Sequence, residues 1–255
     1  MKNEVELIGV YGGDITHAQS AWTSTYRELT DEKFARMDKL IDKLIMEGHH
    51  TPFEKSMLHF IARTDLATHI HILKHRIGVS VNGESARYKE LGNRKGEEGD
   101  RQLDRFYVPL DWPAKLRMEL AQHAMDCYDR YHAAINCMKE VGISRKRAKE
   151  SARFFLPYAA QLRIDLSFNF RSFMHFTLLR DSRHAQKEVS WVAQECRRLL
   201  EERSDDFKLT FAAFDKKVEA ERTKDKLFKA YLDSGKSVKD VITSIRLVRK
   251  NSSID

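Results

Sequence analysis

Cysteine, proline and glycine are scarce: the 255 residues include only three, four and eleven of them, respectively. Because Cys127, Cys137 and Cys196 are odd in number and form no CxxC pair, neither a disulfide framework nor a thiolate zinc site is expected. No run of about 18 apolar residues occurs, which excludes a membrane-spanning helix. The first residues also lack the apolar core of a signal peptide. We therefore predict a cytoplasmic protein without membrane attachment.

Positive charge is in modest excess and unevenly spread. The chain has 45 Lys and Arg against 38 Asp and Glu, a formal net charge of +7. Residues 216–255 carry +5 of this charge, and their apolar residues keep a helical spacing. We therefore predict a basic amphipathic helical extension there, rather than a disordered tail. Net positive charge of this size is compatible with binding nucleic acid, with binding anionic small molecules, and with no specific anionic partner.

Long helices are expected because prolines and glycines rarely interrupt the chain. Alternating apolar residues predict strands over 4–10, 57–61 and 162–168. Apolar spacings of three and four predict helices over 31–48, 66–73, 116–138, 171–179 and 184–202, with Ser144 capping one more helix that ends before Pro157. The glycine-containing stretch 82–100 is expected to be a loop with an exposed excursion over 93–100. These elements predict one helix-rich α+β domain over 1–215, followed by the extension.

Residues suited to gripping anions gather in four places along the chain. These are 49–54, 74–76 with 85–88, 153–157, and 169–172 with 180–186. Arginine forks bind phosphate through two parallel hydrogen bonds, and serine and backbone N–H groups add donors at turns. The adjacent cations Lys74, His75 and Arg76 are costly to hold together unless an anion or water screens them. Such triplets are usually solvated surfaces, but here a Gly- and Ser-containing loop follows, as in phosphate cradles.

Other chemistries find little support in the sequence. His71 and His75 are four residues apart, but the cations beside them would repel a metal dication, so no metal site is predicted. No Rossmann or Walker glycine motif occurs. The cysteines lie on predicted helices and are interpreted as core residues, not nucleophiles. Aromatic residues interleave with the basic segments, as core packing or as stacking platforms for a flavin or base: Phe154, Phe155, Phe168, Phe170, Phe173 and Phe176.

Five segments together resemble the flavin-dependent thymidylate synthases. His75-Arg76, eight residues and Ser85-Ala86-Arg87-Tyr88 resemble the Arg-His-Arg…Ser signature of that family. The other matches are Gly48-His49-His50-Thr51-Pro52-Phe53-Glu54, Ala152-Arg153 with Leu156-Pro157, Asn169-Phe170-Arg171-Ser172, and Leu179-Arg180 through His184-Ala185-Gln186-Lys187-Glu188. They occur in the order of the family, within about residues 5–215.

The resemblance implies a fold, a reaction and a set of site residues. It implies a homotetramer built on a central mixed or antiparallel sheet, with active sites shared between subunits. It also implies an FAD-dependent methyltransferase that converts dUMP to dTMP, with methylenetetrahydrofolate as carbon donor and NADPH as reductant. Residues implied to bind FAD are Ser24, Thr51, Glu54, Lys74, His75, Arg76, Asn82, Asn169, Arg171, His175 and His184. Residues implied to bind dUMP are His71, Glu84, Ser85, Ala86, Arg87, Arg153 and Arg180.

The implied catalytic residues are Arg180, Ser85 and His49, with Arg180 polarising the uracil ring and His49 near flavin and folate. Reduced FAD supplies the hydride in this family, so positioning and electrostatics fall to the protein. In keeping with this, no cysteine lies in any of the five segments.

The chain departs from the family pattern at three places. Lys74 replaces the first arginine of the signature and loses its bidentate fork. Gly83 stands where the family often has glutamate, with Glu84 one residue later, and His175 stands where an asparagine is common. These departures leave open a related FAD- and folate-dependent methylase or hydroxymethylase with an altered pyrimidine substrate. A nucleic-acid-binding protein is the alternative from a different class, and we consider it the less favoured one.

Overall fold

The computed structural model describes residues 2–26, 28–88, 90–91 and 105–233, together with 239 and 243. The predicted excursion over 93–100 and most of the extension beyond 233 lie outside these residues. The chain forms two compact units, one from residues 1–27 and 51–206 and the other from 28–50 and 207–255. Each unit is described by itself below.

A four-stranded antiparallel sheet is the centre of the first unit. Its strand order is β1 (Glu4–Tyr11), β2 (Met57–Asp65), β4 (Gln161–Phe168) and β3 (Val79–Gly83). The predicted strands are confirmed, and the α+β, helix-rich fold with them. The start of the predicted loop at Asn82 is wrong by two residues, because Asn82 and Gly83 pair with Asp165 and Ile164 and end β3.

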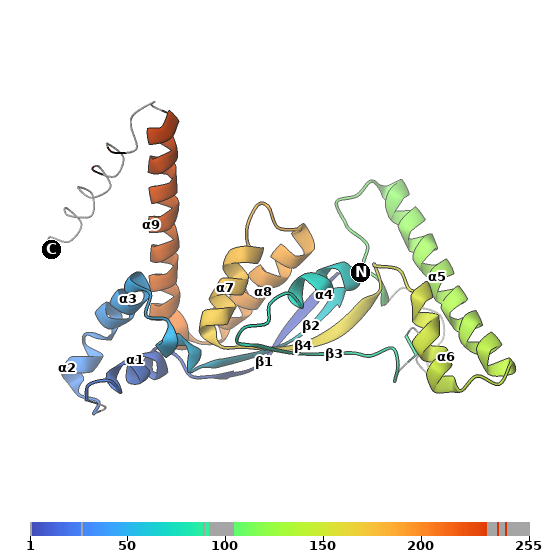
Figure 1. Ribbon diagram of the computed structural model, residues 1–255, viewed down its shortest axis with the longest axis horizontal. Helices are drawn as coiled ribbons and strands as arrows, with labels where there is room; N and C mark the ends of the chain where they lie inside the picture. Colours follow the sequence, from blue (N-terminus) through green and yellow to red (C-terminus); the bar gives the residue numbers. More distant parts are fainter. Residues whose placement is uncertain are drawn as a thin grey trace. The chain divides into compact units, whose positions relative to one another are not determined.

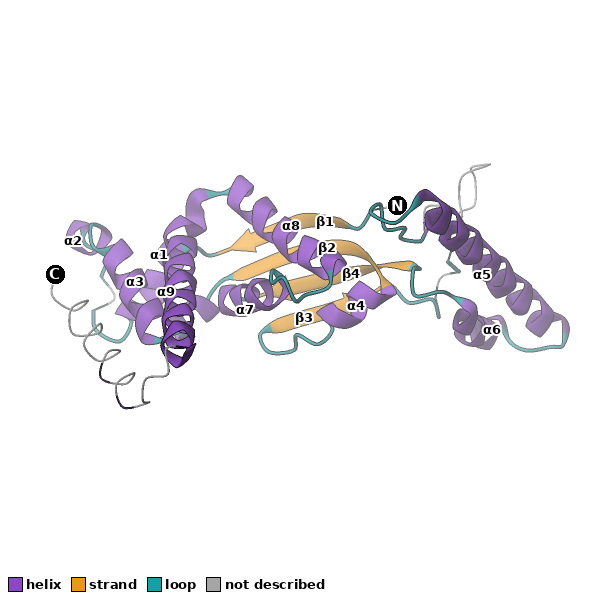
Figure 2. Cartoon of the chain, turned by 90° about the horizontal axis from the view of Figure 1, so that it is seen from above, coloured by secondary structure: helices purple, strands orange, loops and turns teal. Residues whose placement is uncertain are grey.

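Three helices cover one face of this sheet, as Figures 1 and 2 show. They are α4 (Leu66–Ile72), α7 (Phe170–Arg180) and α8 (Lys187–Arg203). Alternate strand residues such as Phe60 and Phe168 point to this face and are buried there. Phe60 stacks on Phe173 with ring centroids 5.8 Å apart, and Phe168 lies 5.3 Å from Phe176. The four aromatic residues between 168 and 176 are therefore core residues.

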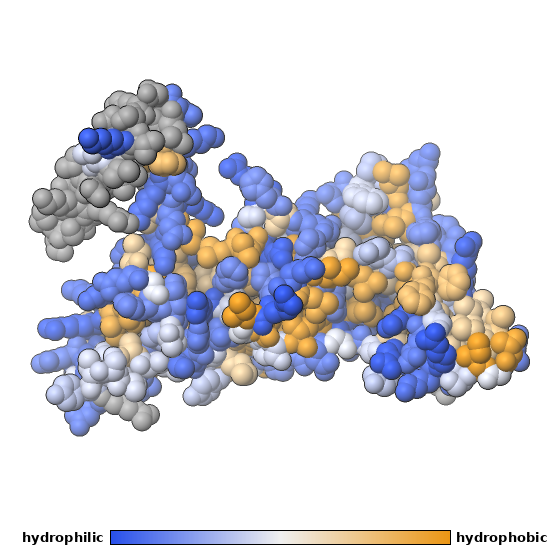
Figure 3. Space-filling model, in the orientation of Figure 1, coloured by the Kyte–Doolittle hydropathy of each residue, from blue (hydrophilic) through white to orange (hydrophobic). Residues whose placement is uncertain are grey.

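A helical hairpin in the same unit packs around its own core. It consists of α5 (Ala114–Glu140) and α6 (Arg145–Ala152), followed by the 3₁₀ turn η3 (Arg153–Phe155). Ser144 caps α6 as predicted, since its side chain accepts from the Arg147 N–H at 3.4 Å. The core between the helices includes Tyr128 and Tyr131. Figure 3 shows hydrophobic side chains at the turn between α5 and α6, which exposes Val141 and Ile143.

Aromatic and cysteine positions correct two interpretations. Phe154 and Phe155 of η3 are exposed, so they do not belong to the core. Cys196 is buried, and its burial raises the pKa of the thiol, whereas Cys137 on α5 is exposed and is not a core residue. Among the described residues, no helix is long and apolar enough to cross a membrane.

The second unit is helical. It contains α2 (Asp31–Phe34), α3 (Met37–Glu47) and α9 (Lys208–Asp233), which packs on α3. The predicted helix over 31–48 is two helices, and it ends as expected at Gly48, which has a φ of +82°. The predicted domain boundary between 215 and 216 falls inside α9, so the described part of the extension continues this helix; the division of function at that boundary stays a prediction. Figure 3 shows a mainly hydrophilic visible face on α9.

Helix α1 (Asp14–Trp22) and two 3₁₀ turns are the remaining short elements of the described residues. Helix α1 packs on the 3₁₀ turn η1 (Thr51–Glu54), and a further 3₁₀ turn, η4 (Asp205–Phe207), precedes α9. His17 on α1 donates to or accepts from the Ser56 hydroxyl at 3.0 Å and meets the ring of Phe53 edge to face. Burial lowers the pKa of His17 to about 4, so this contact is made by a neutral ring at pH 7.

Candidate functional site

Arg180 and His75 meet at the end of α7, although 105 residues separate them in the chain. The Arg180 Nε donates to Nε2 of His75 at 2.9 Å, and Nη2 donates to the backbone carbonyl of His71 at 3.1 Å. His71 and His75 lie at the end of α4 and just beyond it, so α4 and α7 together place the guanidinium. The predicted residues His71, His75 and Arg180 are thus in direct contact.

His75 is neutral at physiological pH. Its side chain is buried, with the ring edge-on to Phe176 at a centroid distance of 5.0 Å. Burial, together with electrostatic interactions with Arg180 and His175, lowers the pKa of His75 to about 4. Because Nε2 accepts the Arg180 hydrogen bond, the single proton of the ring is on Nδ1. Consequently the charge of Arg180 is hydrogen-bonded but not neutralised.

Gly78 fixes the basic triplet to the start of α7. Its φ is +64°, and a Cβ there would lie 2.2 Å from Oγ of Ser172 and 2.4 Å from Nδ2 of Asn169. Asn169 caps α7 by accepting from the Ser172 N–H at 2.8 Å, while its own N–H donates to the Gly78 carbonyl at 3.1 Å. Only glycine allows this close approach, which the sequence did not reveal.

The three residues of the basic triplet, Lys74 to Arg76, alternate between exposed and buried positions. His75 is buried, whereas Lys74 and Arg76 on either side of it are exposed. Within the described residues, Lys74, Arg76, Arg153 and Arg180 form no ion pair with a carboxylate. Exposed or half-buried cations without acidic partners attract anions, and arginine does so with a planar fork. We call this candidate anion-binding arrangement the His75 cluster: Lys74 to Gly78, Asn169, Ser172 and Arg180.

The start of α7 also carries Arg171, which pairs with Glu54 of η1. Both side chains are at least one third exposed, so this ion pair alone adds little stability. It nevertheless joins two predicted FAD-binding residues from segments more than 100 residues apart. Thr51, at the other end of η1, is exposed.

The turn after β3 holds Ser85, Ala86 and Arg87. The Ser85 Oγ accepts from the Arg87 N–H at 3.2 Å, and the Ser85 carbonyl accepts from Tyr88 N–H at 3.1 Å. Ala86 is buried against the α5–α6 core. The Arg87 Nε donates to Glu150 of α6 at 2.8 Å, and this hydrogen bond lowers the pKa of the Glu150 carboxyl.

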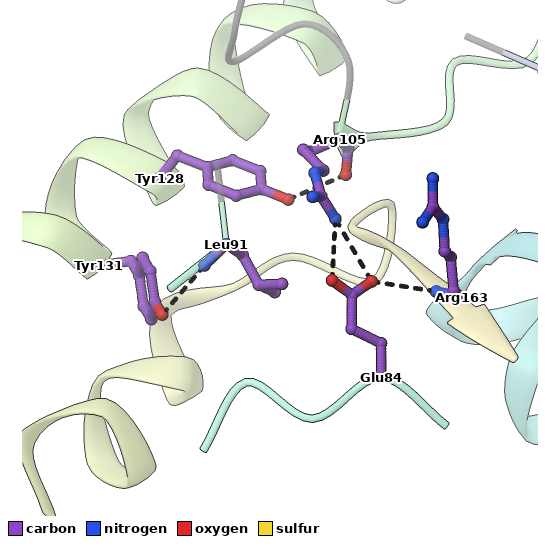
Figure 4. Close-up of polar contacts among 6 residues, drawn as sticks. All are labelled: Glu84, Leu91, Arg105, Tyr128, Tyr131 and Arg163. Carbon is purple, nitrogen blue, oxygen red and sulfur yellow. Dashed lines mark hydrogen bonds and ion pairs between the residues drawn. The ribbon is translucent and has the colours of Figure 1, made fainter. Parts of the chain in front are cut away.

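Glu84 precedes this turn and points inward, as Figure 4 shows. Both carboxylate oxygens lie 3.3 Å from Nη1 of Arg105, and Oε2 also accepts from the Arg163 N–H at 3.2 Å. The backbone carbonyl of Arg105 in turn accepts a hydrogen bond from the Tyr128 hydroxyl at 2.9 Å. Sequence reasoning missed Arg105 and Tyr128, because neither lies in a motif.

The other predicted residues lie outside these contacts. Among the described residues, the side chains of Ser24, Asn82, Arg153 and His184 form no hydrogen bond or ion pair with the His75 cluster. His49 belongs to the second unit, where it lies 3.5 Å from Glu47 and both side chains are exposed. His175 is exposed on α7, with its ring centroid 6.2 Å from that of His75. Groups of three or more residues that could hold a metal ion do not occur in the described part of the chain.

Known proteins resemble this chain in sequence and in fold. The family model described as Thy1, thymidylate synthase complementing protein, matches residues 6–204. A flavin-dependent thymidylate synthase from Pseudothermotoga lettingae is 32% identical over 196 residues, covering 74% of this chain and 80% of that protein. Another from Thermotoga neapolitana is 30% identical over 202 residues, covering 79% and 87%.

A solved structure extends the comparison to three dimensions. The UMP/dUMP methylase PolB from Streptomyces cacaoi, bound with 5-Br dUMP, has a TM-score of 0.64 and 27% identity, covering 84% of this chain and 95% of PolB. The sequence and fold thus define an enzyme of the methyltransferase type. The chain belongs to the flavin-dependent thymidylate synthase family, and the resemblance predicted from the motifs is confirmed.

Proposed function

We propose that this protein converts dUMP to dTMP, using FAD, methylenetetrahydrofolate as the carbon donor and NADPH as the reductant. The observation that carries the proposal is the His75 cluster. Its cations lack acidic partners among the described residues, and they lie on the segments that match the family. A nucleotide and a dinucleotide cofactor supply the phosphates that such cations bind.

The residues present suit FAD. Lys74 and Arg76 flank the buried His75 and would hold its phosphates, while Asn169, Arg171 and Glu54 supply hydrogen-bonding groups at the start of α7. Thr51, His175, His184, Asn82 and Ser24 complete the proposed cofactor set. Bound FAD, once reduced, supplies the hydride that completes the methyl group.

Arg180 is proposed to act on the uracil of dUMP. Of its five N–H groups, two donate to His75 and to the His71 carbonyl, which leaves three for a ligand. A donor held rigidly in this way stabilises negative charge that develops on the ring during methylene transfer. His75 holds the guanidinium without cancelling its charge because the imidazole is neutral.

Ser85, Arg87 and Arg153 are proposed to bind the sugar and phosphate of dUMP. Arg153 and Ser24 do not contact the His75 cluster within the described residues, and a homotetramer would allow them to complete the site of another subunit. His49 is proposed to lie near the flavin and folate. A cytoplasmic location without membrane attachment completes the proposal.

A second reaction is favoured by one departure and one comparison. Gly83 replaces the family glutamate, and Glu84 is engaged by Arg105. PolB, with 27% identity, is a UMP/dUMP methylase. Methylation of UMP in addition to dUMP is therefore the alternative to test. Nothing in the part of the chain that the structure describes favours a nucleic-acid-binding function.

The test is an assay of the FAD-loaded protein with methylenetetrahydrofolate and NADPH. We expect dUMP, offered in parallel with UMP and dCMP, to yield dTMP by mass spectrometry, and no product without the folate. Absence of dTMP from dUMP would contradict the main proposal, and a methylated UMP product would support the alternative. A flavin absorption spectrum of the purified protein separates both enzymes from a nucleic-acid-binding protein, which would be colourless.

A further inference from the structure

Glu84 sits where the chain leaves the sheet, and its carboxylate is largely removed from water. The side chains of Glu84 and Arg105 are 12% and 9% exposed. At such burial an unpaired carboxylate is strongly disfavoured, so the pairing with Arg105 compensates the loss of hydration of the Glu84 carboxylate. Figure 4 shows the carboxylate directed at the Arg105 guanidinium, while the side chain of Arg163 extends away from it.

The backbone of Glu84 is fixed as well as its side chain. Its N–H donates to the Arg163 carbonyl at 2.8 Å, and its carboxylate accepts from the Arg163 N–H at 3.2 Å. Glu84 thereby pairs with β4 one residue beyond the end of β3. Ser85 follows Glu84 directly, so the backbone position at which the turn begins is fixed.

Arg105 is held in place by the helical hairpin. The Tyr128 hydroxyl of α5 donates to the Arg105 carbonyl, and the next residue, Phe106, forms a β-bridge with Ala160. Tyr128 is buried, which raises the pKa of its hydroxyl and keeps it protonated as a donor. The chain of contacts from Tyr128 through Arg105 to Glu84, which we call the Glu84 brace, joins α5 to the edge of the sheet.

The brace leaves Glu84 little capacity to bind a ligand. An ionised carboxylate has about four acceptor sites, and Arg105 and the Arg163 N–H already occupy three. The position of Glu84, immediately before Ser85 and Arg87, instead suits a residue that sets the geometry of that turn. Arg87 is tied at the far end of the turn to Glu150.

We propose that Arg105 is a positioning residue for nucleotide binding, and that it acts through Glu84, which does not itself contact the nucleotide, to orient the Ser85–Arg87 turn. This inference rests on the proposed function, in which that turn binds the pyrimidine nucleotide. It extends the site to α5, which carries none of the family's motif residues in this chain. It also explains how a shift of the glutamate by one residue is accommodated.

The experiment compares Arg105→Met, Glu84→Gln and the double variant with wild type, all loaded with FAD. The matched control is Arg145→Met, because Arg145 pairs with Glu90 but is 66% exposed. We expect each single variant to raise the KM for dUMP about tenfold and to change kcat much less, because a displaced turn weakens binding. The KM of the double variant should be no higher than that of either single variant, since both substitutions remove the same Glu84–Arg105 interaction. The control should resemble wild type.

Additive effects in the double variant would overturn the inference, since they would mean that Glu84 contacts the nucleotide independently of Arg105. Arg105→Lys, which keeps the charge, guards against a folding failure and should partly restore the KM.

Hydrogen exchange of the amides of 84–88 provides a readout that needs no nucleotide. It should be faster in Arg105→Met than in wild type, with exchange in α7 unchanged, and equal rates would overturn the inference. If wild type itself binds no pyrimidine nucleotide, the proposed function fails, and the exchange result decides on the brace alone.

Discussion

The His75 cluster and the Glu84 brace both contain arginines but treat their charge in opposite ways. In the brace, Arg105 faces Glu84, and both side chains are largely buried. In the His75 cluster, Arg180 faces a neutral imidazole and a carbonyl, while Lys74 and Arg76 lie exposed. A balanced arginine fixes structure, whereas an arginine without a counter-ion retains its field for a ligand. We therefore expect the His75 cluster to contact a ligand and the Glu84–Arg105 pair to support the proposed nucleotide-binding turn.

The largest effect is expected from Arg180→Ala. This change removes the donor proposed to act on the uracil ring, so dTMP formation should fall by about 100- to 1,000-fold, the cost of losing one such donor. The measurement is kcat/KM for dUMP, with circular dichroism to show that the fold persists. Arg203→Ala, at the exposed end of α8 and outside the predicted site segments, is the control and should keep nearly full activity. A rate near wild type for Arg180→Ala would refute the role given to Arg180.

A second test asks whether the His75 cluster depends on close packing at Gly78. Gly78→Ala combines a positive φ with a Cβ only 2.2 Å from the Ser172 Oγ, so we expect a loss of about 2 kcal/mol or more in the free energy of unfolding. Gly142→Ala is the matched control, because its φ is +85° and no atom lies within 4 Å of the added Cβ. It should cost about 1 kcal/mol from strain alone. Denaturant titration and flavin retention measure both, and equal losses would show that packing at Gly78 is not limiting.

The smallest effect concerns pH. The pKa of His75 is lowered from 6.5 to about 4 in the folded protein, so below pH 6.5 the unfolded chain takes up a proton that the folded protein does not. Stability from the neutral ring is therefore complete above pH 6.5 and is lost as pH falls toward 4. His75→Gln keeps an acceptor for Arg180 but cannot titrate.

The wild type should lose roughly 2 kcal/mol more than His75→Gln between pH 6.5 and 4. Urea titrations at several pH values measure this difference. His17, whose pKa is also lowered to about 4, is present in both proteins, so its contribution cancels. Parallel stability curves for the two proteins would mean that His75 titrates normally.

Much of the fold follows from local pattern. Alternation in β4 and the three-four spacing in α5 are set by which residues face the core, and both elements form nearly where expected. The pairs that define the site are different. Arg180 reaches His75 across 105 residues, and Glu84 meets Arg105 across 21 with no motif to connect them. Tertiary packing brings these groups together, and single-chain periodicity contains no information about it.

The hydrogen bond from Asn169 to the Gly78 carbonyl makes two segments part of one cooperative folding unit. The residue that caps α7 also anchors the loop that carries His75, so the helix start and the loop cannot be ordered separately. Fluctuations that fray the first turn of α7 must release the loop as well, and the two segments should then show one shared opening free energy in native-state exchange. Thermal loosening would thus disorder the His75 loop and the start of α7 together.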